Sequence, residues 1–140
     1  MIAGSKICTQ FKRDLLSGRH AFDQDQFMLA LYTSAATLDP DLTTNYNPGG
    51  EVAGPGYTAG GQLLVNPQIL TMAQVAYASF DDAVWAASSI TARAALLYNH
   101  SKQDLAVAIL DFGSDQTSNQ GSFHVQFPPP GPTTALIRIA

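Results

Sequence analysis

The side chains that most often carry chemistry are sparse in this chain, and its three histidines lie far apart. His20, His100 and His124 are separated by long stretches of sequence. A local metal-binding motif needs spacings such as HxH or HxxxH, which place two imidazoles on one face of a strand or helix. No histidine has a partner at such a spacing. We therefore expect no metal site and no other cofactor.

The carboxylates and the thiol form no catalytic pattern either. Asp81 and Asp82 are adjacent, and neighbours on a strand point to opposite faces, which makes a general acid and base pair unfavourable. Asp104 and Asp111 bracket one expected strand and are interpreted as edge residues. Cys8 is the only cysteine, so no disulfide can form within the chain, and we interpret it as a structural thiol. The sequence contains no GxSxG motif. We expect that the protein is not an enzyme.

A glycine-rich stretch at residues 45–61, NYNPGGEVAGPGYTAGG, holds six of the 11 glycines. A phosphate-binding loop would require GxxxxGK[ST], or a GxGxxG that follows a strand and opens a helix. The stretch has neither pattern, and the residues after it are typical of another strand. Glycine and proline at this density favour tight turns. We interpret the segment as turns around a short extended piece at 51–54.

Most of the chain shows the two-residue period of β-strands. The run at 104–114 is apolar on both faces, which is typical of a central strand. Residues 83–97 are rich in alanine, yet polar turn segments on either side favour strands over a helix. Further strands are expected within residues 26–34, 62–65, 75–87, 89–99, 121–128 and 134–140. Seven to nine strands at this spacing predict an all-β sandwich or barrel.

The strand pattern also assigns faces to individual side chains. In the run at 121–128, three apolar residues are expected to point inward and two polar residues outward: Phe123, Val125 and Phe127 against His124 and Gln126. Trp85 and Tyr98 could stack on a sugar, but we interpret both as core aromatic residues.

The first twenty residues differ from the rest in charge. Residues 1–20 hold four basic side chains against one acidic, a net +3, whereas residues 21–140 hold three basic and ten acidic, a net −7, which together give −4. We expect two units: an N-terminal arm over 1–20 and a single β-sandwich domain over 21–140. The few basic residues do not indicate nucleic-acid binding. No apolar run is long enough for a leader or a membrane span, and we expect a soluble intracellular product.

Charged residues make up only 13% of the chain, about half of the usual share, which suggests that much of the surface is covered by a partner. Residues 8–17 predict a short amphipathic helix, with an apolar stripe of Phe11, Leu15 and Leu16, closed by Gly18. Such a short helix is marginal alone in water, so it must dock on its own domain or on a partner. We favour a partner, with Phe11 and Leu15 buried in the contact and Arg13 and Arg19 at its rim.

Six phrases are spread over residues 8–140: CTQFKRDLLSGRHAF, QFMLALYTSAATLD, GEVAGPGYTAGG, FDDAVWAASSITARAALLYN, AVAILDFG and ALIRIA. They resemble a family of small proteins from tailed bacteriophages and prophages. The family includes the cement, or decoration, proteins that clamp the outside of podovirus heads. Their fold is jelly-roll-like.

This resemblance implies a jelly-roll-like β-sandwich with a short N-terminal helical segment, and it implies no catalytic residues. It also implies a place on the exterior of the phage head in the virion, after synthesis in the bacterial cytoplasm, with the major capsid protein as partner. Use at two-fold positions of the shell would suit a homodimer. Two alternatives stay open: a head–tail connector or tail-associated structural protein, and a carbohydrate-binding β-sandwich module.

Overall fold

A computed structural model describes residues 6–139, and within them it contains one helix and ten strands. In chain order these are β1 (Lys6–Ile7), α1 (Thr9–Leu16), β2 (Phe27–Tyr32), β3 (Gln62–Leu63), β4 (Gln68–Met72), β5 (Val75–Ser79), β6 (Ala83–Ser88), β7 (Thr91–Asn99), β8 (Leu105–Thr117), β9 (Gly121–Val125) and β10 (Ile137–Ile139). The expected all-β class with one short helical segment is confirmed.

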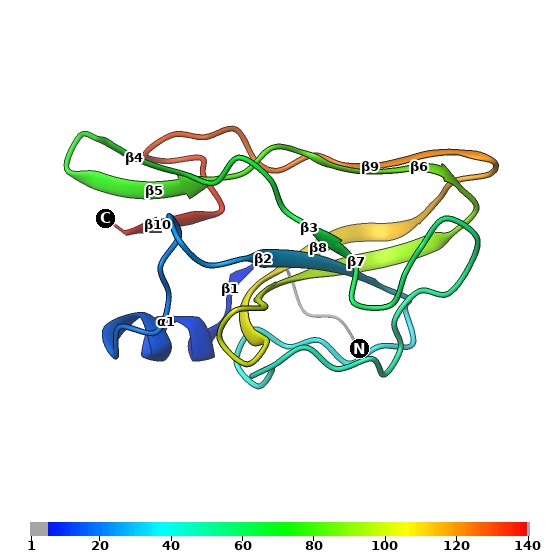
Figure 1. Cartoon of the computed structure of the whole chain (residues 1–140), viewed down its shortest axis with the longest axis horizontal. Helices are drawn as coiled ribbons and strands as arrows, with labels where there is room; N and C mark the ends of the chain where they lie inside the picture. The colour runs from blue at the N-terminus through cyan, green and yellow to red at the C-terminus, as the bar shows by residue number, and fades with distance from the viewer. Residues whose placement is uncertain (1–5, 140) are drawn as a thin grey trace.

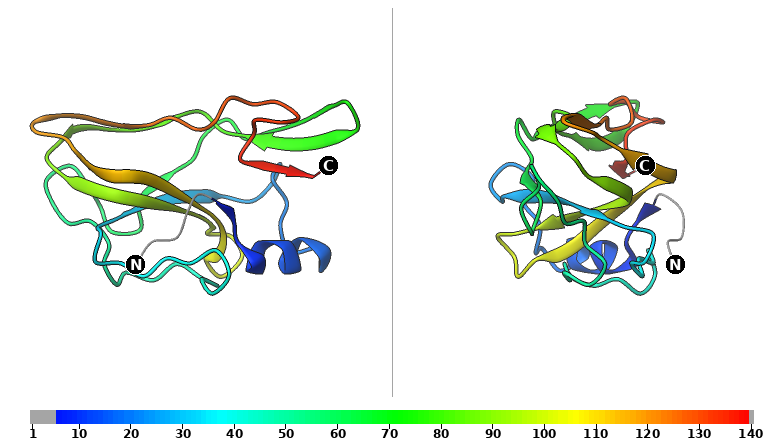
Figure 2. Two further views of the ribbon diagram at one scale, coloured as in Figure 1. Left: turned by 180° about the vertical axis from the view of Figure 1, so that it is seen from behind. Right: turned by 90° about the vertical axis from the view of Figure 1, so that its right-hand side faces the viewer.

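The strands form two layers, as Figures 1 and 2 show. One layer is a five-stranded sheet in the order β1-β8-β7-β2-β3. The other holds a three-stranded sheet, β10-β5-β4, and a two-stranded ribbon, β6-β9. Helix α1 lies on the side of the five-stranded sheet that faces away from the second layer. The main core fills the space between the layers and continues beneath the helix.

The pairing of strands is nested along the chain. Strand β7 pairs with β8, β6 with β9, and β5 with β10, all antiparallel. This is one antiparallel ribbon folded over on itself, the pairing scheme from which a jelly roll is built. The run expected at 75–87 is split by residues 80–82 into β5 and β6, because the ribbon passes there from one sheet to the next.

Strands β7 and β8 occupy the centre of the five-stranded sheet, and most of β7 and residues 105–110 of β8 are buried on both faces. Ala94 and Ala95 on β7 and Ala106 and Ala108 on β8 are all fully buried. Small side chains suit a strand that is covered on both faces, because the elements above and below can approach the backbone closely. The strand interpretation of the alanine-rich segment is therefore confirmed.

On β9 the expected faces are largely confirmed. Phe123 and Val125 are buried, and His124 is exposed. Gln126, just beyond the strand, is exposed as expected. Phe127 is only half-buried, because it lies beyond the strand end and contacts Phe80 at a ring-centroid distance of 6.2 Å.

The N-terminal segment departs from the expected arm. Strand β1 pairs with β8, and the backbone N–H of Cys8 donates to the carbonyl of Val107 at 2.8 Å. Phe11 is 2% exposed and belongs to the main core, as does Cys8. From residue 6 onward the segment is therefore part of the domain's own fold. Residues 1–5 of the expected arm lie outside the described residues.

The expected apolar stripe of α1 is wrong in one member. Phe11 and Leu15 face the body of the protein, but Leu16 is 91% exposed, and the buried position of the last turn is taken by Asp14 at 1%. Asp14 is held there by the amide of Gln10, at 2.9 Å from Oδ2. The helix thus buries a hydrogen-bonded carboxylate and presents a leucine to solvent.

The glycine-rich stretch is confirmed as a set of turns. Gly50 and Gly61 have φ angles of +80° and +84°, a region that other residues rarely adopt. A Cβ on Gly61 would lie 1.9 Å from the carbonyl oxygen of Leu29, so the loop there is pressed against β2. The extended piece at its centre is a single bridge between Glu51 and Tyr32.

Candidate functional site

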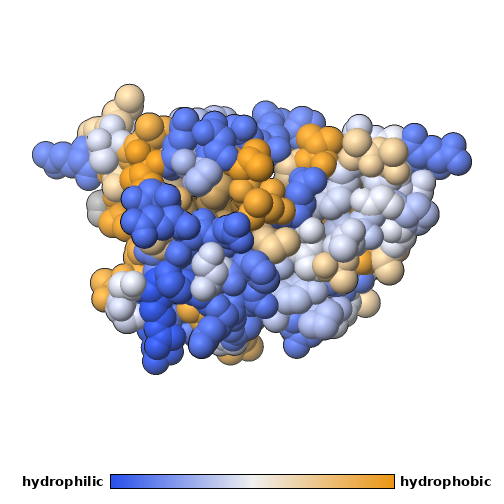
Figure 3. Space-filling model, in the orientation of Figure 1, coloured by the Kyte–Doolittle hydropathy of each residue, from blue (hydrophilic) through white to orange (hydrophobic). Residues whose placement is uncertain are grey.

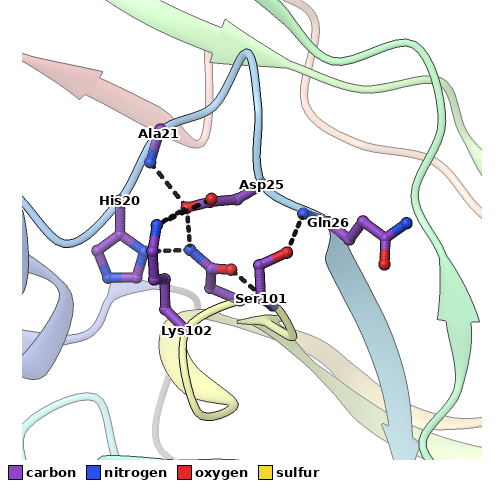
Figure 4. Close-up of polar contacts among 7 residues, drawn as sticks. His20, Ala21, Asp25, Gln26, Ser101 and Lys102 are labelled. Carbon is purple, nitrogen blue, oxygen red and sulfur yellow. Dashed lines mark hydrogen bonds and ion pairs between the residues drawn. The ribbon is translucent and has the colours of Figure 1, made fainter.

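A polar cluster lies where the segment after α1 meets the β7–β8 turn (Figure 4). The carboxylate of Asp25 accepts hydrogen bonds from the backbone N–H of Ala21 at 2.9 Å and from the side-chain amide of Asn99 at 2.8 Å. The ammonium of Lys102 lies 2.9 Å from both of its oxygens. The hydroxyl of Ser101 accepts from the backbone N–H of Gln26 at 2.8 Å.

The hydrogen bonds of Asn99 decide the protonation of His20. The Oδ1 of Asn99 accepts from the backbone N–H of Ser101, and its amide group donates to Asp25 and to Nδ1 of His20, at 3.0 Å from the latter. Nδ1 therefore carries a lone pair, and the proton sits on Nε2. Nε2 is buried and has no hydrogen-bond partner within residues 6–139.

The pKa values of His20 and Asp25 are both lowered, which favours the neutral form of the histidine and the charged form of the aspartate. Burial lowers the pKa of His20, against the raising effect of Asp14 and Asp25, so the neutral imidazole is favoured. Burial acts to raise the pKa of Asp25, but the hydrogen bonds from Asn99, Lys102 and Ala21 outweigh it, and the pKa is lowered. The cluster thus holds a neutral histidine beside a charged carboxylate, and it ties two segments together.

A second cluster surrounds Glu51, the only charged residue of the glycine-rich stretch. Its two oxygens accept from the hydroxyls of Tyr46 and Tyr57, at 2.6 and 2.5 Å, and Oε2 also accepts from the backbone N–H of Gly60 at 2.8 Å. Burial and the hydrogen bond to Glu51 raise the pKa of both tyrosines. The hydroxyl of Tyr98 donates to the carbonyl of Gly60 at 2.5 Å. The hydrogen bonds of Glu51 therefore hold the glycine-rich loop in place on the five-stranded sheet.

Sequence reasoning did not identify Glu51 or the Asp25–Asn99 cluster. The one signal for Glu51 was its isolation as a single charge among glycines. For Asp25 and Asn99 no local signal existed, because the two residues are brought together only by the pairing of Phe27 on β2 with Asn99 on β7.

A cleft with a volume of about 610 Å³ is lined by residues 35–39 and 42–45 together with Tyr32, Asn47, Gly49 and Gly50. Several of its polar groups are engaged in local turns: Asn47 accepts from the N–H of Gly49, and Asp39 from that of Asp41. Tyr32, the aromatic side chain in the lining, is 1% exposed. The cleft therefore offers no aromatic platform to a sugar.

The remaining residues considered for chemistry form separate pairs. His100 lies 2.9 Å from Asp104, and His124 lies 3.2 Å from Asp82. Asp111 forms an ion pair with Arg93, so Asp104 and Asp111 do not act together. Within residues 6–139, no group of three or more His, Cys, Asp or Glu side chains is placed to hold a metal ion.

The thiol and the two aromatic residues lie in the core. Burial raises the pKa of the Cys8 thiol to about 12, with a smaller effect of Asp39, so the thiol stays protonated at neutral pH. Trp85 and Tyr98 are 5% and 2% exposed, and their interpretation as core residues is confirmed.

The residues expected to contact a partner are divided between interior and surface. Phe11 is buried in the protein's own core, so the expectation that it contacts a partner is not met in this fold, and Leu15 is half-buried. Arg13 and Arg19 are exposed. The guanidinium of Arg19 lies 4.0 Å from Asp14. The exposed side of the helix, here called the α1 outer face, consists of Lys12, Arg13, Leu16 and Arg19.

Large apolar side chains are also exposed at the opposite layer. In the view of Figure 3, hydrophobic residues gather over the region of β4, β5 and β10. Ile69, Leu70 and Met72 on β4 are 55%, 37% and 58% exposed. Residues 52–80 contain no charged residue at all. Strand β4 was not expected from the sequence. It follows Pro67 directly, and its five residues show no clear alternation of apolar and polar side chains.

Comparison with protein families, with curated proteins and with solved structures yielded no match to this chain. None of the described helical segments is long and apolar enough to cross a membrane.

Proposed function

We propose that this protein is a structural virion protein that binds the outside of a bacteriophage head and stabilises it by bridging subunits of the major capsid protein. The observation that carries the proposal is the number of large apolar side chains exposed on a surface with few charges. A chain with only 13% charged residues exposes large apolar side chains both on helix α1 and on the second layer, including Leu16 at 91% and Met72 at 58%. Exposed apolar side chains in such numbers favour contact with other proteins. The sequence phrases that resemble phage cement proteins point to the same role.

The mechanism of such a protein is mass action. A protein that binds only the assembled shell lowers the free energy of that shell relative to its free subunits. A rigid binder transmits this effect best, because little of its binding free energy is lost in ordering. The fully buried β7–β8 centre and the loop fastened by Glu51 supply that rigidity.

We propose that the α1 outer face is one shell contact. It combines an almost fully exposed leucine with Lys12, Arg13 and Arg19, on a chain that is otherwise acidic. Leu16 would enter an apolar pocket on the shell, as a central contact residue does. Arg13 and Arg19 would act at the rim, where charges affect the association rate and its salt dependence more than the affinity. Phe11 serves this contact indirectly, by holding the helix on the sheet.

The alternatives receive less support. A carbohydrate-binding module would need exposed aromatic side chains beside polar ones, and among the described residues the only aromatic side chain that lines the 610 Å³ cleft, Tyr32, is buried. A head–tail connector differs from a cement protein in copy number: a connector forms a ring at one vertex, whereas a cement protein covers the head. Quantitative gel analysis of purified virions separates these two.

Binding to isolated heads tests the proposed contact. Heads stripped of this protein are mixed with the wild type, with Leu16→Ser, or with Val65→Ser, which removes another exposed apolar side chain (51% exposed) away from α1. We expect wild type and Val65→Ser to bind and to raise the temperature at which heads release DNA, and Leu16→Ser to bind at least tenfold more weakly. Failure of the wild type to bind any head contradicts the function. Equal binding of all three contradicts only the α1 contact.

A further inference from the structure

We propose that β4 is a dimerisation edge, where two copies of this chain pair antiparallel across a two-fold axis at Leu70. The two three-stranded sheets would then form one continuous six-stranded sheet. Such a dimer would form in the free protein, so it does not depend on a role in the virion.

The β4 edge (Gln68–Met72) lacks the features by which edge strands usually avoid pairing. Within the described residues, β4 pairs with β5 alone and leaves its other edge open. All five of its residues are exposed. The pairing with β5 is regular over its whole length, without a bulge, and the strand contains no charged residue and no proline. Natural edges normally carry a lysine, a proline or a bulge against such contacts.

The hairpin turn shows which backbone groups of β4 face outward. Ala73 and Gln74 both have positive φ, 53° and 66°, and they join Met72 to Val75 as a two-residue turn of type I′. The residues that flank such a turn exchange both of their backbone hydrogen bonds. Bonding alternates along an antiparallel pair, so Leu70 also faces β5. The backbone N–H and C=O groups of Ile69 and Thr71 must then point away from the sheet.

In one register, these four outward groups of one copy pair with the same set of groups of the second copy. With Leu70 on the two-fold axis, Ile69 lies opposite Thr71 of the second copy, and Thr71 opposite Ile69, so both pairs exchange two hydrogen bonds. Ile69 and Thr71 are β-branched and share one face, a favourable cross-strand pair. On the other face Leu70 meets its own copy.

Neighbouring registers are unfavourable. A shift of two residues in one direction places Pro67 opposite Thr71, and proline has no N–H to donate. The same shift in the other direction places Ile69 opposite Ala73, whose positive φ removes it from the extended conformation. The edge is thus limited at both ends to the register centred on Leu70.

The charge distribution favours a second copy over a charged partner. Each chain carries a net charge of −4, which opposes association of most surfaces with themselves. The β4 edge lies within the uncharged residues 52–80, so the two strands that would meet carry no charged side chain. A charged peptide strand would instead place its ions opposite Ile69, Leu70 and Met72 without a counter-charge.

Sedimentation equilibrium over micromolar concentrations tests the dimer. We expect twice the mass of the 14.9 kDa chain for the wild type. Thr71→Lys should raise the dimer dissociation constant at least tenfold with an unchanged circular dichroism spectrum, and Thr58→Lys, in an exposed loop, should leave it unchanged. A wild type that stays monomeric, or a Thr71→Lys protein that dimerises as well as Thr58→Lys, overturns the proposal. A wild type that stays monomeric and pairs only with another protein would also overturn it.

Crosslinking and hydrogen exchange test the register. Leu70 would form a pair without mutual hydrogen bonds, in which side chains are close enough for a disulfide. Leu70→Cys should therefore oxidise to a covalent dimer at least tenfold faster than Val84→Cys, whose parent residue is similarly exposed at 39% against 37%. The native Cys8 is buried. The amides of Ile69 and Thr71 should gain protection as concentration rises. Equal crosslinking of both variants, or unchanged exchange of these two amides, refutes this register.

Discussion

Strands β7 and β4 place apolar residues in opposite environments. The centre of β7 is built largely of alanine and leucine and is almost fully buried, whereas β4 carries isoleucine, leucine and methionine and is exposed at every position. Size and hydropathy alone would assign the larger side chains to the core. What differs is position: β7 has a strand on each side and is covered on both faces, whereas β4, within residues 6–139, has a neighbouring strand on one side only. Topology, rather than hydropathy, therefore decides which apolar surface is left for a partner.

The largest effect on stability is expected where the glycine-rich loop lies closest to β2, at Gly61. Gly61→Ala adds a Cβ 1.9 Å from the carbonyl oxygen of Leu29, so β2 or the loop must move. We expect destabilisation of about 4 kcal/mol or more, or failure to fold. Gly113→Ala is the matched control: its φ is +82°, yet nothing lies within 4 Å of the added atom. It should cost about 1–2 kcal/mol, the cost of the backbone conformation alone. Denaturant unfolding measures both, and equal losses would contradict the close contact.

The next effect compares the two strands directly. Leu96→Ala on β7 removes a fully buried side chain and should lower the free energy of unfolding by about 2–5 kcal/mol. Leu70→Ala on β4 should change it by less than about 0.5 kcal/mol when measured at concentrations where the protein is monomeric. A loss above about 2 kcal/mol for Leu70→Ala would show that β4 is packed within the monomer.

A smaller effect on stability is expected when the pH is lowered and His20 becomes protonated. The pKa of His20 is lowered in the fold, so the unfolded chain, with a histidine pKa of about 6.5, binds more protons just below that value. Stability should therefore fall as pH decreases from about 7 towards the lowered folded pKa. His20→Gln should flatten this dependence. Thermal unfolding between about pH 5 and 7.5 provides the measurement, and parallel profiles for the wild type and His20→Gln would exclude His20 as the source.

At still lower pH the carboxylate of Asp25, in the same cluster, becomes protonated. The pKa of Asp25 is lowered in the fold, so its contribution is present above the pKa of the unfolded aspartate and is lost as pH falls through the lowered value. The effect of Asp25→Asn should therefore be greatest at neutral pH and should shrink in strong acid. A constant difference between wild type and variant across this range would contradict the ionised assignment.

The smallest effect is expected at the tip of the exposed hairpin. Ala73 and Gln74 adopt positive φ without the residues that favour it. Replacing them with Asn-Gly, the preferred type I′ pair, should stabilise the protein by about 1 kcal/mol. The dimer register should be unchanged, because the β4 edge keeps its residues. A destabilised variant would show that the turn is not of this type.

Local patterns in the sequence predicted the all-β class, the strands at the centre, the turns at residues 45–61 and the inward faces of Phe123 and Val125. These features repeat over two residues or depend on glycine and proline, so a short stretch of chain contains them completely. The same patterns did not predict β4, the exposure of Leu16 or the burial of Asp14. For an amphipathic helix of two turns, the buried face is set by what packs against it, and here Gln10 beside Asp14 makes a carboxylate acceptable in the interior.

The sequence by itself determined that this chain folds as strands around a core and that its titratable residues follow no local catalytic spacing, because both are properties of residue type and period. The tertiary structure alone decided that residues 6–16 belong to the same core as the rest, that Glu51 and Asp25 become centres of hydrogen bonding, and that β4 is left at an open edge. Each of these depends on segments far apart in the chain meeting in space, through the pairing of β1 with β8, of β2 with β7 and of β5 with β10.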